Sequence, residues 1–175
     1  MMTDKAYEKM LDGVVAWTEA QIQEGRRLQD IEDALDAKAR DALDSRPDLV
    51  EALRAHLRGE GPEPKLDRTG EAYMWGAKRV GMVMATRNLK GRQLEKQGRL
   101  YDAMVLYELN VADGMQGSHP YDRLRIIYTR QKRYEDAAWV CQAYLSLPDR
   151  EHGQAKDHFR HHLQRLQVKA ARDGG

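Results

Sequence analysis

The chain has 175 residues, of which 33% are charged and 7% aromatic, and its formal net charge is +1. This composition favours a helical protein over a β-sandwich, and the length suits one good core or a small core with an appended segment. A single cysteine excludes an internal disulfide framework, and without a signal-peptide pattern or a run of roughly 18 apolar residues we expect a cytoplasmic protein that engages no membrane.

The N-terminal part, residues 1–58, predicts three successive helices. Apolar residues recur at spacings of three and four over residues 4–23 and again over residues 26–43, which is the pattern of amphipathic helices. Ser45 is expected to cap a third, short helix that has Pro47 in its first turn. The stripe residues are Tyr7, Met10, Leu11, Val14, Trp17, Thr18, Leu28, Ile31, Leu35, Ala42, Leu49, Leu53 and Leu57.

A linker over residues 59–70 predicts a domain boundary, because Gly59-Glu60-Gly61-Pro62-Glu63-Pro64 cannot continue a helix. Beyond it, residues 71–170 are predicted to form a second helical domain, followed by a tail over residues 171–175. The helical pattern of residues 71–97 fits one long helix or two shorter ones. Three glycines inside this pattern predict that other helices approach it closely, on more than one side: Gly76, Gly81 and Gly91.

Residues 98–147 contain one helical-hairpin pattern written twice. Gly98-Arg99-Leu100-Tyr101-Asp102-Ala103 corresponds to Lys132-Arg133-Tyr134-Glu135-Asp136-Ala137 at an offset of 34 residues. That period is the length of a helix–turn–helix repeat, whose exposed apolar face needs a terminal cap. A further apolar stripe over residues 153–170, which includes Phe159 and Leu163, predicts the capping helix.

On these residues, the segment 84–151 resembles two tetratricopeptide repeats. The second copy matches best, with Tyr121, Leu124 and Tyr128 on its first helix, whereas the first copy has Arg87 and Lys90 where large apolar residues are expected. The resemblance implies an all-α fold of helical hairpins, a fragment of a right-handed superhelix. It also implies a function in protein–protein interaction, as an adaptor or assembly component, rather than in catalysis.

In tetratricopeptide repeats the first helices line a concave groove. Carried onto this chain, the resemblance predicts a mainly basic groove that would receive an acidic peptide or a C-terminal carboxylate through charge-assisted hydrogen bonds. The same basic residues are explained equally well as ordinary solvated charges on exposed helix faces that bind no ligand. The predicted groove residues are Asn88, Arg92, Lys96, Arg123, Arg130, Lys156 and Arg160.

The charges leave other functions open. Residues 1–64 carry 9 Lys and Arg against 15 Asp and Glu, whereas the remainder carries 20 against 13. The acidic N-terminal helices could therefore occupy the groove or mediate self-association. A basic run from Lys78 to Arg99 makes a nucleic-acid-associated protein the main alternative, and a structural oligomerisation subunit is another.

Nothing in the sequence predicts catalysis or a cofactor, since phosphate-binding loops and dinucleotide fingerprints are absent. His158 and His162 are four residues apart and could reach one metal ion, but no accompanying motif supports this, so we expect a histidine-rich surface helix and no metal site. Cys141 is expected to be a buried, inert thiol. The Ala-, Arg- and Asp-rich usage suits a high-GC bacterium or its phage.

Overall fold

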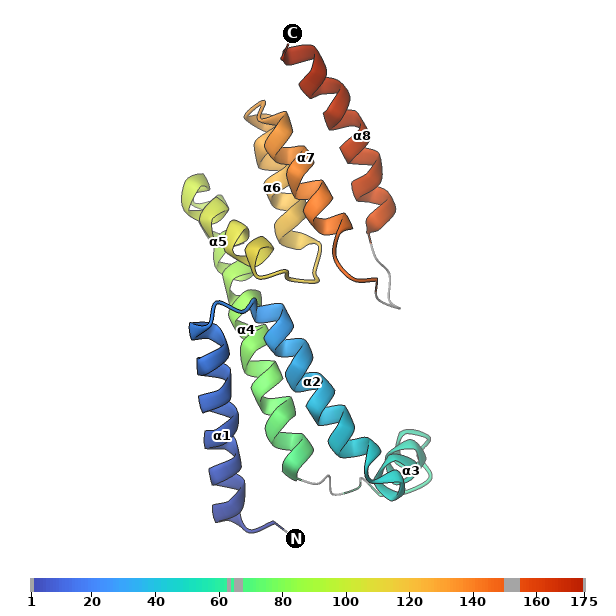
Figure 1. Cartoon of the computed structure of the whole chain (residues 1–175). Coiled ribbons are helices and arrows are strands. Elements are labelled where there is room, and N and C mark those ends of the chain that lie inside the picture. The colour runs from blue at the N-terminus through green and yellow to red at the C-terminus, as the bar shows by residue number, and fades with distance from the viewer. Residues whose placement is uncertain (1, 63, 65–67, 150–154, 175) are drawn as a thin grey trace. The chain divides into compact units, whose positions relative to one another are not determined.

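The computed structural model describes residues 2–62, 64, 68–149 and 155–174. Over these residues the chain forms eight α-helices and no strand (Figure 1), which confirms the predicted all-α class. The chain divides into two compact units, residues 1–83 and 84–175. The helices are α1 (Asp4–Gln23), α2 (Leu28–Asp44), α3 (Pro47–Leu57), α4 (Arg68–Lys96), α5 (Leu100–Ala112), α6 (His119–Arg130), α7 (Tyr134–Leu145) and α8 (Lys156–Asp173).

Local chemistry explains where the N-terminal helices begin and end. The Thr3 hydroxyl accepts the backbone N–H of Ala6 at 3.3 Å and so caps α1. After the C-terminus of α1, Gly25 adopts a φ of +77°, which glycine tolerates without strain. Ser45 does not cap α3 as predicted; its hydroxyl donates to the carbonyl of Ala42 at 2.8 Å, at the end of α2.

In the N-terminal unit, α1, α2 and the first half of α4 lie side by side (Figure 1). A Cβ atom added to Gly76 of α4 would lie 2.6 Å from Val14 Cγ1 and 3.3 Å from Leu35 Cδ1. The missing side chain therefore lets α4 approach α1 and α2 closely. This confirms the prediction that the segment is packed on more than one side, and the helix is continuous from Arg68 to Lys96.

The boundary between the two compact units does not lie at the predicted linker. It lies inside α4, between Val83 and Met84, because the first half of this helix packs against α1 and α2. Helix α4 also begins at Arg68, within the predicted linker of residues 59–70. At the other end, α8 continues through most of the predicted tail to Asp173.

In the C-terminal unit the same turn is built twice, at the two positions that the 34-residue offset relates. Gly98 has a φ of +75° and Lys132 a φ of +60°. In each copy the next residue, Arg99 or Arg133, donates its backbone N–H at 2.9 Å to the carbonyl five residues earlier. Each of these arginines also pairs with the aspartate three residues later. The sequence repeat is therefore matched by a repeat of local structure.

One apolar core holds this unit together. Ala103 and Ala137 are fully buried on the second helices of the two copies, and burial raises the pKa of the Cys141 thiol to about 11, as expected for an inert buried cysteine. The remaining core residues come from all five helical segments of the unit: Leu94, Met104, Tyr107, Val111, Tyr121, Leu124, Ile127, Tyr128, Val140, Tyr144, Leu147, Phe159 and Leu166.

Candidate partner-binding surface

Helices α4, α6 and α8 contribute to one polar surface of the C-terminal unit. Arg123 of α6 pairs with Glu95 of α4, and Asp122 of α6 contacts His158 of α8, with 3.1 Å between the carboxylate Oδ1 and the imidazole Nε2. These contacts link the first helices of the two repeat-like hairpins to the terminal helix. We call the surface formed by residues 88–96, 122–130 and 156–169 the groove face.

Arg123 ties two helices together and is not a free cation. Its guanidinium holds the Glu95 carboxylate through two hydrogen bonds, one of them from Nε to Oε1 at 3.0 Å. The hydroxyl of buried Tyr107 donates to the same oxygen at 2.7 Å. Burial alone would raise the pKa of Glu95, but the hydrogen bonds from Arg123 and Tyr107 outweigh it and keep that pKa below its ordinary value. The acid is therefore ionised and neutralises Arg123.

Two other predicted groove residues are also engaged within the chain. The Oδ1 atom of Asn88 accepts a hydrogen bond from Asn110 Nδ2 at 2.9 Å. The Lys156 ammonium donates to the carbonyl of Leu147 at 2.8 Å and pairs with Asp149, so that its side chain is only 12% exposed. Both side chains therefore stabilise this unit through internal contacts, and these contacts do not support the prediction that they bind a ligand.

The remaining predicted residues are exposed cations. Arg92, Lys96 and Arg130 form no ion pair with any other residue that the structure describes. Arg160 is exposed as well, but it pairs with Asp157 three residues earlier, a contact that is worth little in water. The structure therefore reduces the predicted basic set to three free cations and one weakly paired one.

Sequence reasoning missed two cations of α8. A hollow of about 130 Å³ lies between α6 and α8 on the groove face. Arg165 and Lys169 border it, and both are exposed with no ion pair in the described part of the chain, although the Lys169 ammonium lies 5.5 Å from the centroid of the Tyr134 ring. A spacing of three or four residues places four side chains on this face of the helix, and it could have predicted the two cations: His158, His162, Arg165 and Lys169. The lining residues are Arg125, Thr129, His162, Arg165, Leu166 and Lys169.

Two histidines of α8, His158 and His162, take part in a hydrogen-bonded cluster. Asp122 accepts from Arg125 at 2.7 Å and contacts His158, and Nδ1 of His162 lies 3.3 Å from Arg125 Nη1. No group of three metal-ligating side chains occurs among the residues that the structure describes. His152, the fourth histidine of the sequence cluster, lies outside them.

Two half-buried histidines predict a loss of stability on mild acidification. Burial, with Arg92 and Arg123 nearby, lowers the pKa of His119 below 6.5, and burial, with Arg125 nearby, lowers that of His162. The unfolded chain therefore binds protons first, and the free energy of unfolding falls as the pH drops from about 6.5 towards the lowered folded-state values. We expect the urea midpoint to decrease between about pH 7.5 and 5.5, and to decrease less in a His119→Gln/His162→Gln variant. Equal slopes in the two proteins would contradict this assignment.

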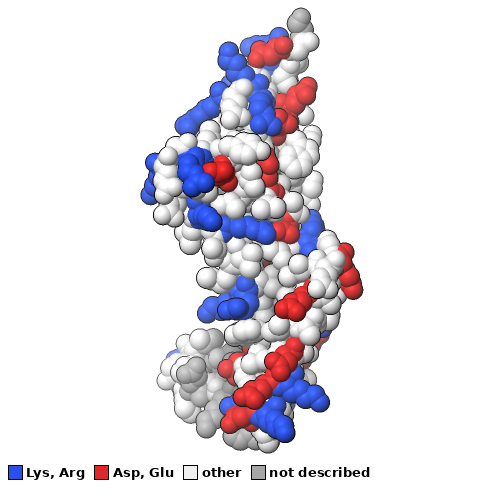
Figure 2. All heavy atoms as spheres, turned by 90° about the vertical axis from the view of Figure 1, so that its left-hand side faces the viewer, with Lys and Arg blue, Asp and Glu red and all other residues white. Residues whose placement is uncertain are grey.

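The basic run proposed for nucleic acid is only partly available. Arg87 is held by Asp113 within the C-terminal unit, and Arg79 stacks on Trp75, with 5.3 Å between the guanidinium carbon and the ring centroid. Within each unit, the face shown in Figure 2 carries both basic and acidic side chains. With Arg87 and Arg79 engaged in this way, fewer cations of the run are available for phosphate contacts.

No family model matches this chain, and neither a curated protein nor a solved structure does. Among the described residues, no helix combines the length and the apolar character that crossing a bilayer requires. The function must therefore be argued from the residues of the chain itself.

Proposed function

We propose that the C-terminal unit is a non-catalytic protein-binding module, an adaptor or assembly component, whose groove face receives an acidic peptide. The observation that carries the proposal is the set of free cations on this face. Five exposed Lys and Arg side chains lack an ion-pair partner in the described chain, although carboxylates lie on the same helices. They are Arg92, Lys96, Arg130, Arg165 and Lys169. The resemblance to tetratricopeptide repeats, which bind partners on this face, supports the same function.

The internal pairs leave these cations free to act on a ligand. Glu95 is bound by Arg123 and Asp122 by Arg125, so these two carboxylates are already neutralised, and exposed Asp157 pairs with Arg160. An incoming carboxylate therefore meets unpaired guanidinium and ammonium groups and little repulsion. Guanidinium–carboxylate pairs are directional and strong, so a peptide with repeated acidic side chains fits this surface better than a neutral one.

Reversing the charge of two cations of the groove face should weaken peptide binding. As probe we choose a labelled decapeptide of alternating Glu and Ser, with the corresponding Gln and Ser peptide as neutral reference. We expect Arg130→Glu/Lys169→Glu to weaken binding of the acidic peptide by at least about tenfold in fluorescence anisotropy, because two attractive contacts become repulsive. The matched control is Lys132→Glu, which makes the same kind of charge change in the turn between α6 and α7.

The controls separate this function from its alternatives. Two results would contradict the proposed binding of an acidic peptide to the groove face. One is equal affinity for the acidic and neutral peptides, and the other is an equal loss of affinity in Lys132→Glu. A single-stranded oligonucleotide that binds more tightly than the acidic peptide, with an affinity that falls steeply with salt, would favour the nucleic-acid function. In that case a Lys78→Glu/Lys90→Glu variant should lose the oligonucleotide.

A further inference from the structure

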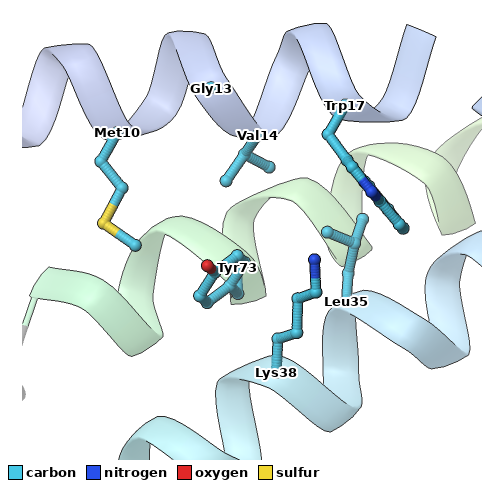
Figure 3. Close-up of a pocket in the computed structure, with 7 residues that line it drawn as sticks. All are labelled: Met10, Gly13, Val14, Trp17, Leu35, Lys38 and Tyr73. Carbon is cyan, nitrogen blue, oxygen red and sulfur yellow. The ribbon is translucent and has the colours of Figure 1, made fainter. Parts of the chain in front are cut away.

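The N-terminal unit contains a hollow that the proposed peptide-binding function does not use. It has a volume of about 320 Å³ and opens between α1, α2 and the first half of α4 (Figure 3). That volume lies at the lower end of the range of small-molecule sites, about 300–1,000 Å³. The hollow is lined by Met10, Gly13, Val14, Trp17, Leu35, Lys38 and Tyr73.

A missing side chain helps to keep the hollow open. Gly13 lies on its wall in the middle of α1, and a Cβ atom added there would meet no other atom within 4 Å. Around it, the side chains of Met10, Val14 and Leu35 give the hollow an apolar lining, with the rings of Trp17 and Tyr73 on either side (Figure 3). Such a site takes up an apolar group by removing its surface from water.

One cation points into this apolar space. The Lys38 ammonium lies 4.3 Å from the centroid of the Trp17 ring and 5.6 Å from that of Tyr73, as Figure 3 shows from the side. No carboxylate that the structure describes pairs with it, although residues 1–64 carry 15 Asp and Glu. Lys38 is thus the one lining residue with a full charge, and its ammonium lies against the two rings.

We propose that this hollow binds a small monocarboxylate with an apolar body, whose carboxylate accepts a hydrogen bond from the Lys38 ammonium. An anion is preferred to a cation because the two aromatic faces already hold a cation, Lys38 itself. The apolar lining selects the body of the ligand, and the ammonium selects its head group. A carboxylate close to an ammonium in an apolar hollow also forms a stronger pair than it would at an open surface.

Octanoate tests this proposal, with octanamide as a neutral ligand of the same length. The readout is the indole N–H resonance of Trp17 in a ¹H–¹⁵N spectrum of the full chain, assigned among the three tryptophans with a Trp17→Phe variant. We expect octanoate to shift this resonance in a saturable manner, with an affinity at least about tenfold higher than that of octanamide. Lys38→Met should remove this preference, whereas Lys38→Arg should retain it.

A control on the same helix guards against general effects of charge and folding. Arg40→Met removes one positive charge from an exposed position of α2 that does not line the hollow. It should bind octanoate as the wild-type chain does, and all variants should show wild-type helical circular dichroism. Equal affinities for octanoate and octanamide, an unshifted Trp17 resonance, or an unchanged preference in folded Lys38→Met would each overturn the proposal.

Discussion

Replacing Gly91 by alanine should destabilise the C-terminal unit, although alanine is the better helix former. A Cβ atom at this position of α4 would lie 2.6 Å from Cε1 and 2.8 Å from Cζ of the Tyr107 ring. The ring cannot retreat easily, because it is fully buried and its hydroxyl is bonded to Glu95. Overpacking of this kind costs about 1–3 kcal/mol, which exceeds the gain of about 1 kcal/mol in helix propensity. Because the contact of 2.6 Å lies well inside van der Waals distance, we expect a net loss of about 1–2 kcal/mol in urea unfolding.

Gly13 supplies the matched control for this substitution. It also lies inside a helix, α1, but a Cβ atom there meets nothing within 4 Å, so Gly13→Ala should stabilise the chain by about 0.5–1 kcal/mol. A second variant tests the cause, since Tyr107→Leu should make the added Gly91→Ala change less harmful. If Gly91→Ala were as stabilising as Gly13→Ala, the ring of Tyr107 would not be the barrier that the structure indicates.

The helices of this chain could be predicted from periodicity because each must bury one stripe. The stripe over residues 4–23 predicts α1, which spans Asp4–Gln23, and the apolar residues of the two hairpins are those that form the core. The division into units could not be predicted in this way. It depends on which helices cover the first half of α4, and a linker rich in glycine and proline carries no information about that packing.

The groove residues show a different limit of sequence reasoning. Helical register predicts which cations share a face, but not which of them a carboxylate of the same chain neutralises. Arg123 is neutralised by Glu95, 28 residues away in the sequence, and Lys156 by a partner near the end of α7. The repeat pattern extends only to the first turns of the C-terminal helix, so it does not predict Arg165 and Lys169. Which cations remain unpaired is thus decided by the packing of the helices, which the sequence pattern does not describe.

A polar cluster surrounds Arg87, one of the two residues at which the first helical hairpin lacks the large apolar side chain that the resemblance predicts. Asn110 of α5 is fully buried, and its amide donates to the carbonyl of Met84 at 2.8 Å and to Asn88 at 2.9 Å. Its Oδ1 atom accepts from Arg87, which also pairs with Asp113. A buried amide so fully engaged is costly to change alone, because each lost partner leaves another polar group without a hydrogen bond.

Asn110→Leu should therefore destabilise the chain by about 2–3 kcal/mol in urea unfolding, and Arg87→Met by a similar amount. The double variant should lose less than the sum of the two by at least about 1 kcal/mol, because the two polar groups that depend on each other are removed together. Arg99→Met is the matched control: its partner Asp102 is exposed, so the loss should stay below about 0.5 kcal/mol. Strict additivity would mean that Arg87 and Asn110 are stabilised independently, and that the polar cluster does not act as a unit.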